Sequence, residues 1–147
     1  MDQSGVSVLK KFLLCIFLVL QLAASSTTSE QKIYTLIIKA LFPYKENILV
    51  WVDEEEKKKL FSSIPNITIC KDKNDADILI VGHTQNIQSD SLIFTTNYHL
   101  LKEYQNTAIG GFFWQKGRPN LLFLNKNLKK HHIELPASMQ NYIEKSL

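Results

Sequence analysis

The feature that most constrains the fold is a pair of short runs of consecutive apolar residues. The first run, residues 48–52, reads ILVWV, and the second, residues 78–81, reads ILIV. Strands that are apolar at consecutive positions are typical of parallel sheets, because helices then cover both faces of the sheet. The two runs therefore predict a mostly parallel sheet between two layers of helices.

Helical patterns alternate with these strands along the chain. Residues 31–41 carry one apolar stripe at helical spacing, and Asp53 is expected to cap a second helix that buries Leu60 and Phe61. Further helices are expected at residues 98–104, at residues 126–132 and after Pro136, and further strands at residues 67–70 and 91–95. This alternation indicates an α/β fold of three layers, with a mostly parallel sheet and helices on both of its faces.

The N-terminus has the order of a secretory signal peptide. Two lysines precede an apolar run over residues 12–20, and small and hydroxylated residues follow it. The run is shorter than the roughly 20 apolar residues of a membrane-spanning helix. We therefore expect a signal peptide at residues 1–25, a flexible leader at residues 26–30 and a single α/β domain at residues 31–147. The domain is expected to be periplasmic or secreted, without membrane insertion once the signal is removed; an uncleaved N-terminal anchor is the alternative.

Charge and cysteine content narrow the class of partner. Lys and Arg number 17 against 14 Asp and Glu, and the formal net charge of +3 favours neither nucleic acid nor anionic lipid. Cys15 lies in the apolar N-terminal run, which leaves Cys70 without a partner for an internal disulfide. Because Cys70 ends an apolar run, we expect it to be a buried small hydrophobe, with a reactive thiol as the alternative.

Motifs of common enzymes and metal sites are missing from the sequence. There is no glycine-rich phosphate loop, no Gly-x-Ser-x-Gly elbow and no His-Glu-x-x-His helix. Asp72, Asp75 and Asp77 do not have the spacing of a calcium loop, and adjacent histidines such as His131 and His132 point about 100° apart on a helix. We therefore expect no metal and no cofactor, and a non-catalytic function is favoured over a thiol enzyme based on Cys70.

Polar residues follow the expected parallel strands at their carboxyl ends, where ligands usually bind in sheets of this class. Asp53 follows the first apolar run, His83 and Thr84 follow the second, and Thr96 follows the next strand. Asp53, His83 and Thr84 are therefore candidate ligand-binding residues, for a small anion or as an acid-base pair. The alternative is that Asp53 and Thr96 are helix caps and that His83 is an ordinary loop residue.

Residues 110–124, GGFFWQKGRPNLLFL, predict a β-hairpin at the edge of the sheet. A two-residue turn at Lys116 and Gly117 fixes the pairing of its strands. In this register the core face carries Phe112, Trp114, Leu121 and Phe123. The opposite face carries Phe113, Gln115, Arg118 and Asn120. The second set is the candidate partner-binding surface, because aromatic and Arg anchors contribute most of the energy of many interfaces; ordinary edge packing is the alternative.

The stretches ADILIVG, from residue 76, and AIGGFFWQKGRPNLLFLNKNLKKHHIELPASMQNYI, from residue 108, resemble the closing half of the YfiR-like family of bacterial periplasmic proteins. The counterparts of the family's motifs are Ala76-Asp77, Gly110-Gly111, Phe123-x-Asn125 and Ile133-x-Leu135. The chain is also similar to small exported proteins of Campylobacter-type bacteria. The family resemblance implies a periplasmic regulator that binds the outward-facing domain of a membrane-bound signalling protein, such as a diguanylate cyclase.

The function expected from these observations is that of a non-catalytic exported binding module that acts on a membrane signalling partner. The alternative is a small-ligand binder that uses the carboxyl ends of the strands.

Overall fold

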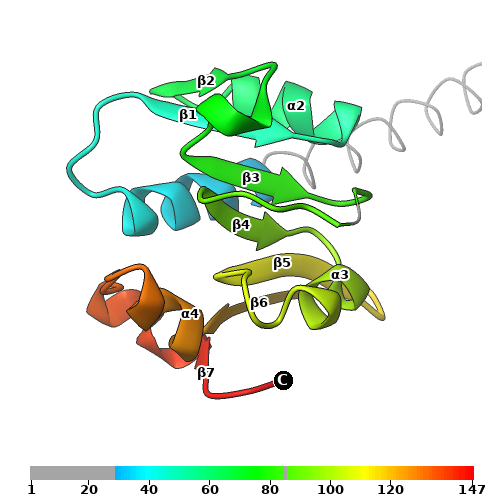
Figure 1. The fold of residues 1–147 in the computed structure, drawn as a ribbon, viewed down its shortest axis with the longest axis vertical. Helices are drawn as coiled ribbons and strands as arrows, with labels where there is room; N and C mark the ends of the chain where they lie inside the picture. The colour runs from blue at the N-terminus through cyan, green and yellow to red at the C-terminus, as the bar shows by residue number, and fades with distance from the viewer. Residues whose placement is uncertain (1–28, 85) are drawn as a thin grey trace, which may run out of the picture.

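The centre of the fold is a seven-stranded sheet. The computed structural model describes residues 29–84 and 86–147, and its strands lie in the order β2-β1-β3-β4-β5-β6-β7 (Figure 1). The strands are β1 (Ile48–Val52), β2 (Ile67–Ile69), β3 (Ile78–Val81), β4 (Leu92–Thr95), β5 (Gly110–Gln115), β6 (Arg118–Leu124) and β7 (Ile143–Glu144). Neighbouring strands are parallel except for β5 and β6, which form an antiparallel hairpin. The predicted α/β fold is confirmed.

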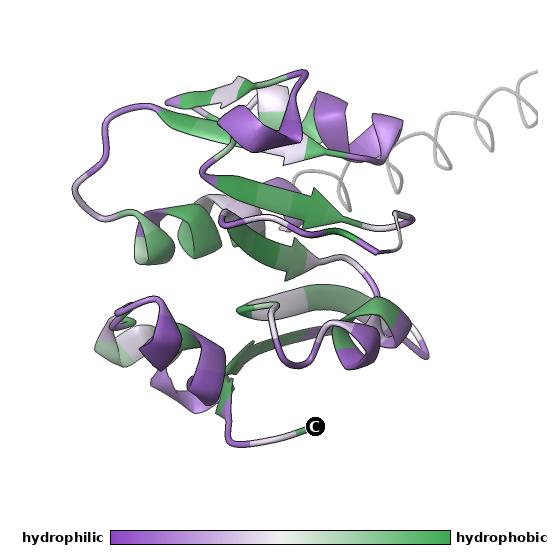
Figure 2. Ribbon diagram, viewed as in Figure 1, coloured by the Kyte–Doolittle hydropathy of each residue, from purple (hydrophilic) through white to green (hydrophobic). Residues whose placement is uncertain are grey.

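Helices cover both faces of the sheet and complete the three layers. The helix at residues 29–41, α2 (Glu55–Ser62) and α4 (Asn125–Lys130) contribute buried residues to one face, and α3 (Tyr98–Glu103) contributes to the other. Figure 1 shows α3 in front of the sheet and the helix at residues 29–41 behind it. The central strands are the most apolar part of the ribbon in Figure 2, as strands covered on both faces should be.

Burial along the strands follows their position in the sheet. All four residues of β3 are at most 1% exposed, because this strand has neighbours on both sides and helices on both faces. Alternate residues of β1 are buried, whereas Leu49 and Trp51 between them are only half-buried. The reason is that β1 lies beside the edge strand β2, which has three residues, none of them fully buried.

The β5–β6 hairpin has the predicted register. Gln115 lies opposite Arg118, and Phe113 lies opposite Asn120. The φ angles of Lys116 and Gly117 are 49° and 74°, so both central residues of the turn are left-handed, as a type I′ turn requires.

Two aromatic side chains of the hairpin have the opposite exposure from the one predicted. Phe113, expected on the open face, is 4% exposed and lies beneath α3, with its ring 5.6 Å from the ring of Tyr98. Trp114, expected in the core, is 50% exposed. It lies at the end of the hairpin, where residues 114–119 are all exposed. The prediction that Phe113 is open to a partner is therefore wrong.

The C-terminal segment also differs from the prediction. The expected last helix is a 3-10 helix, η2 (Ala137–Tyr142), and Ile143 begins β7 instead of continuing that helix. β7 pairs with only Phe123 and Leu124 of β6, because β7 is two residues long. Residues 118–122 therefore remain the edge of the sheet on this side.

The N-terminal predictions lie mostly outside the described residues. This holds for the signal peptide expected at residues 1–25 and for residues 26–28 of the expected leader. Residues 29 and 30 are helical, and Glu30 forms an ion pair with Lys57 of α2. Within residues 29–84 and 86–147, no helix is long and apolar enough to cross a membrane.

Candidate functional site

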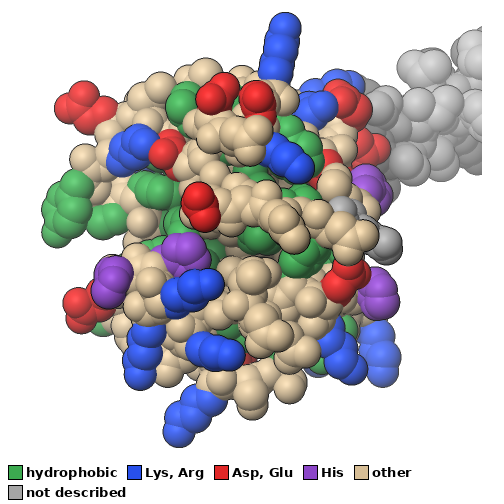
Figure 3. Space-filling model, viewed as in Figure 1, with side chains coloured by type: hydrophobic (Ala, Val, Ile, Leu, Met, Phe, Trp, Pro, Cys, Tyr) green, Lys and Arg blue, Asp and Glu red, His purple; other side chains and the backbone are tan. Residues whose placement is uncertain are grey.

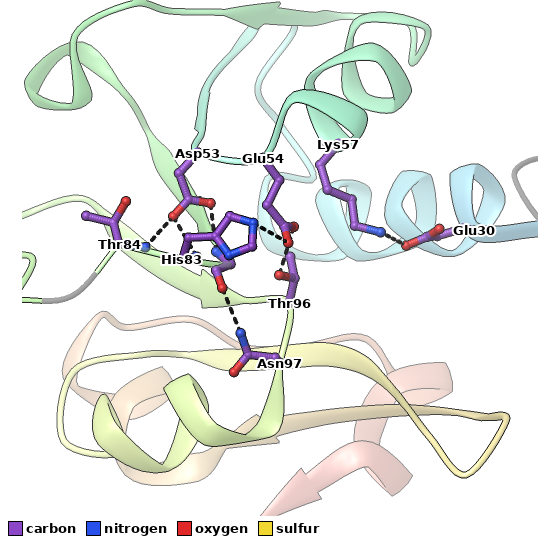
Figure 4. Close-up of polar contacts among 9 residues, drawn as sticks. Glu30, Asp53, Glu54, Lys57, His83, Thr84, Thr96 and Asn97 are labelled. Carbon is purple, nitrogen blue, oxygen red and sulfur yellow. Dashed lines mark hydrogen bonds and ion pairs between the residues drawn. The ribbon is translucent and has the colours of Figure 1, made fainter.

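The strand order changes direction between β1 and β3. From β1 the chain crosses through α2 to β2 on one side, whereas from β3 it continues through β4 to β5 on the other side. In doubly wound sheets, ligands bind outside the carboxyl ends of the strands beside such a point. Asp53 and Glu54 follow β1 at this edge, residues 82–84 follow β3, and Thr96 follows β4 (Figure 4). The structure thus brings together the three residues predicted for this edge, Asp53, His83 and Thr84.

Asp53 holds the loop after β3 in place. Its carboxylate accepts hydrogen bonds from the backbone N–H groups of Gly82 at 2.7 Å, His83 at 2.9 Å and Thr84 at 2.7 Å. Partial burial raises the pKa of Asp53, but the hydrogen bonds from His83, Thr84 and Gly82 outweigh burial and leave this pKa below its ordinary value. Asp53 is therefore a carboxylate that joins β1 to β3, and the expectation that it caps α2 is wrong because Glu54 occupies that position.

Glu54 is the residue on which the strand ends converge. Its Oε2 atom accepts a hydrogen bond from the Thr96 hydroxyl at 2.9 Å, and its Oε1 atom lies 3.5 Å from His83 Nε2. The carboxyl group lies directly over Gly82, where the Cβ atom of any other residue would overlap it. Glu54, His83 and Thr96 come from the ends of β1, β3 and β4, and we call them the strand-end site.

Glu54 is not among the residues that the sequence predicts for this site. Two features of the sequence point to this residue. Glu54 lies between Asp53 and two further glutamates directly after a buried strand, and a glycine follows the next fully apolar strand.

Two further side chains fix the backbone around His83. Asn97 donates to the Gly82 carbonyl at 2.8 Å, while its own side-chain oxygen caps α3 by accepting from the Leu100 N–H at 2.8 Å. The Tyr104 hydroxyl donates to the Thr84 carbonyl at 3.1 Å and accepts from the Ile87 N–H at 2.9 Å. Asn97, and not Thr96, is therefore the N-cap of α3. The loop is held by three side chains, those of Asp53, Asn97 and Tyr104, whereas the His83 side chain itself is 74% exposed.

A second polar group lies beside Glu54. Lys57 of α2 pairs with Glu30 of the helix at residues 29–41, and its Nζ atom lies 5.8 Å from the ring centroid of Tyr34. Tyr34 is fully buried, and its hydroxyl has no hydrogen-bond partner. Burial raises the pKa of Tyr34 well above its ordinary value, and the nearby carboxylates of Glu30 and Glu54 raise it further. The phenol of Tyr34 is therefore neutral.

The residues predicted for partner binding are only partly available. Gln115 and Arg118 are exposed, Asn120 is half-buried and donates to the Arg118 carbonyl at 3.0 Å, and Phe113 is part of the core beneath α3. Trp114 is the exposed aromatic residue next to them. The exposed side chains at the end of the hairpin are thus Trp114 on one face and Gln115 and Arg118 on the other, and we call these three residues the hairpin tip.

Cys70 is half-buried, and not fully buried as expected from the sequence. It packs with Trp51 against the core cluster beneath α3, and burial raises the pKa of its thiol, with the carboxylates of Asp75, Asp72 and Asp77 acting in the same direction. A raised thiol pKa opposes nucleophilic reactivity. Among the described residues, no group of three or more His, Cys, Asp and Glu side chains is placed to hold a metal ion.

An open depression of about 500 Å³ lies at the opposite ends of the strands from the strand-end site. Residues 87–90 line it, together with Asn74, with Ile93 near the start of β4 and with Thr107 before β5. These residues surround the amino ends of the strands, which are not the usual ligand position in sheets of this class. The strand-end site therefore remains the candidate with convergent polar groups.

Comparison of this chain with known protein families, with curated proteins and with solved structures found no match. The resemblance to the YfiR-like family therefore stays a prediction from the sequence motifs.

Proposed function

We propose that the chain is an exported, non-catalytic binding module that holds a small ligand at the strand-end site. The observation that carries this proposal is the convergence of three strand ends on one carboxylate, that of Glu54. Export to the periplasm or the medium is part of the proposal and follows from the order of residues at the N-terminus.

The rigidity of the site's support favours binding. The backbone that carries His83 is fixed by Asp53 on one side and by Asn97 on the other. A site whose supporting shell is already ordered loses little entropy when a ligand arrives. The polar side chains stand at the position in the sheet where ligands are usually held.

A catalytic role has less support. The Asp53 carboxylate is already occupied by three backbone donors, so it is a poor general base. Cys70 has a raised thiol pKa, which opposes its use as a nucleophile. Binding is therefore the function that these groups favour, and no cofactor is part of the proposal.

The proposal predicts that a small ligand stabilises the chain purified after export. The unfolding temperature would be followed with a panel of small ammonium compounds, carboxylates, phosphates and sugars. Because a ligand that binds only the folded state raises this temperature, at least one class should raise it by several degrees. The effect should be lost in a Glu54→Ala/His83→Ala double variant.

The matched control is Glu55→Ala/His99→Ala, which removes the same residue types from exposed positions outside the site. This variant should respond to the ligand like the wild type. Stabilisation that is equal in both double variants, or absent with every class, would contradict the proposal.

A second candidate function is the binding of a membrane signalling protein through the hairpin tip. The observation that favours it is that Trp114 is 50% exposed and that Arg118 is exposed at the same end of the hairpin, since Trp and Arg are enriched among interface anchors. Solubilised membranes would be passed over the immobilised wild type and over Trp114→Ala/Arg118→Ala. The proposal expects one membrane protein to be retained by the wild type alone, and equal recovery by both would remove this surface.

A further inference from the structure

We propose that the outer face of α4 docks on a membrane surface that carries anionic phospholipid. This docking surface is separate from the strand-end site, because α4 follows β6, whereas the strand-end site lies at the ends of β1, β3 and β4.

Charge is divided unevenly between the two sides of the sheet. Residues 105–147 contain six Lys and Arg against two Asp and Glu, whereas residues 29–104 contain nine against eleven. With His neutral, the first segment has a formal charge of +4 and the second a formal charge of −2. The first segment supplies α4 and the neighbouring strands β5, β6 and β7, and its two acids, Glu134 and Glu144, lie outside α4. The net charge of the whole chain does not show this division.

The same division is visible on the molecular surface. In Figure 3 most carboxylates lie in the upper part of the view, whereas Lys and Arg predominate in the lower part. Figure 1, drawn from the same side, places α4 and β6 in that lower part. The basic residues therefore gather on one side of the folded molecule.

The outer face of α4 consists of lysines. Lys126, Lys129 and Lys130 are exposed, and spacings of three and four residues place them on one side of the helix. Asn127 and Leu128 lie on the other side and are buried. Among residues 29–84 and 86–147, no ion pair includes any of the three lysines. We call Lys126, Lys129 and Lys130 the lysine face.

The buried side of α4 fixes the direction of the lysine face. The Asn127 side chain is 1% exposed and donates hydrogen bonds to the carbonyl groups of Gln105 at 2.9 Å and Ala108 at 2.6 Å. Leu128 belongs to the core cluster that α2 also joins. Because the backbone of α4 is already held in place, only the lysine side chains need to be ordered when a partner binds.

Helix stability does not explain the lysine face. Lys129 and Lys130 lie in the last turn of α4, where a cation interacts favourably with the helix dipole, but Lys126 lies in the first turn, where a cation is unfavourable. Lys126 also repels the other two lysines across one turn. On α2, by contrast, Glu55 in the first turn pairs with Lys58. The lysine face lacks such compensation, and an anionic partner would supply it.

The composition of the lysine face favours a lipid surface over a protein or a nucleic acid. It contains no arginine and no aromatic residue, which are the usual anchors of protein interfaces and of contacts with bases. Lysine is a compact, strongly hydrated charge on a flexible stem, so it can meet phosphate groups that have no fixed arrangement. Anionic lipid attracts clustered lysines in this way, and each lysine near the surface raises the affinity about fivefold. This attraction needs no insertion of the chain into the bilayer.

The test is co-sedimentation of the chain purified after export with two kinds of vesicle. One kind contains phosphatidylglycerol and phosphatidylcholine in equal parts, and the other contains phosphatidylcholine alone. The wild type should bind only the anionic vesicles, and about 0.5 M salt should release it because exposed charges are then screened. Lys126→Gln/Lys129→Gln/Lys130→Gln should weaken this binding at least tenfold. Replacement of the same three lysines by arginine keeps the charge and should leave binding like that of the wild type.

The matched control is Lys32→Gln/Lys59→Gln/Lys71→Gln, which removes three exposed lysines from the segment with a formal charge of −2. It changes the net charge of the chain by the same amount and should bind the anionic vesicles like the wild type. Equal unfolding temperatures of the two glutamine variants would exclude a loss of the fold as the cause of the difference.

Three results would overturn the proposed membrane contact. Equal binding of anionic vesicles by the wild type and by the glutamine variant of the lysine face would show that another surface binds them. A lack of binding to anionic vesicles, or equal binding to both kinds of vesicle, would remove anionic lipid as the partner. Tighter binding of poly-glutamate or of a short DNA duplex than of anionic vesicles, lost in the same variant, would assign the lysine face to another class of partner. The vesicles contain no protein, so binding to them is independent of the partner proposed for the hairpin tip.

Discussion

The carboxyl group of Glu54 lies directly over the backbone of Gly82, and each residue restricts the other. Among the described glycines, Gly117 is the one with positive φ, so Gly82 has a backbone conformation that any residue adopts. Its missing Cβ atom is needed for space alone. The sequence shows a glycine after an apolar strand, but it does not show that a glutamate from another strand lies on that glycine.

Gly82→Ala should therefore displace the Glu54 side chain. We expect a loss of about 1–2 kcal/mol of unfolding free energy in the wild type, because the new methyl group overlaps a partly buried carboxyl group. In a Glu54→Ala background the same change should be neutral or slightly stabilising, since the space is then free. Chemical denaturation of the four chains of this double-mutant cycle measures the coupling. Equal effects of Gly82→Ala in both backgrounds would contradict the contact.

Asp53 shows how local rules were overridden at a single residue. A serine, threonine or aspartate before a helical pattern is ordinarily assigned as the cap. In the structure the backbone N–H groups of residues 82–84 bind this carboxylate instead. Sequence spacing could not predict this, because the neighbour of β1 across the sheet, β3, is far away along the chain.

Asp53→Asn should lower the unfolding free energy by about 2 kcal/mol near neutral pH, since hydrogen bonds to a charged acceptor are lost. The folded-state pKa of Asp53 lies below its ordinary value of 3.8. The stability that this carboxylate contributes is therefore full well above pH 4 and is lost as pH falls through the lower, folded-state pKa. Urea unfolding between pH 2 and pH 7 should show a smaller acid loss in Asp53→Asn than in the wild type. Identical pH profiles would contradict the role of the Asp53 carboxylate in joining β1 to the loop after β3.

At the scale of elements, the hairpin was predicted best, because its pairing depends on neighbouring residues. Turn length alone fixed the register of β5 against β6. The burial of its faces was not predictable in the same way, because it depends on α3, which packs over Phe113. Alternation along a strand separates two faces but does not say which of them a distant helix covers.

The backbone of the β5–β6 turn is strained at Lys116, and a substitution should relieve this strain. Lys116 is left-handed at φ 49°, a conformation that asparagine adopts more readily than lysine. Lys116→Asn should raise the unfolding free energy by about 0.5–1 kcal/mol. Lys71→Asn, at an exposed position away from the hairpin, controls for the lost charge and should change stability little. An unchanged or lowered stability in Lys116→Asn would argue against the type I′ turn.

Because α3 packs over Phe113, substitutions in the hairpin can distinguish a core role of Phe113 from a binding role. Phe113→Ala should cost about 3 kcal/mol or more, as expected for a buried aromatic residue. Trp114→Ala, at a half-exposed neighbour, should cost about 1 kcal/mol or less. Equilibrium denaturation measures both, and a reversed order would restore Phe113 as a surface residue.

At the scale of the whole molecule, fold class followed from the two apolar runs, whereas strand order did not. The runs at β1 and β3 required a sheet covered on both faces, and the structure has one. Their adjacency, with β2 on the far side of β1, is set by packing across the whole sheet. That adjacency creates the strand-end site. The sequence shows Glu54 in a run of acidic residues after a buried strand, but the partners of Glu54 depend on the strand order.

The strand-end site is proposed to bind a small molecule, and amide chemical shifts test this central proposal most directly. A ¹⁵N–¹H correlation spectrum of the exported chain would be recorded with and without the compound that most raises its unfolding temperature. The largest changes in chemical shift should cluster at the amides of residues 82–84 and 96–97. Shifts clustered at residues 114–119, or spread evenly over the domain, would contradict it.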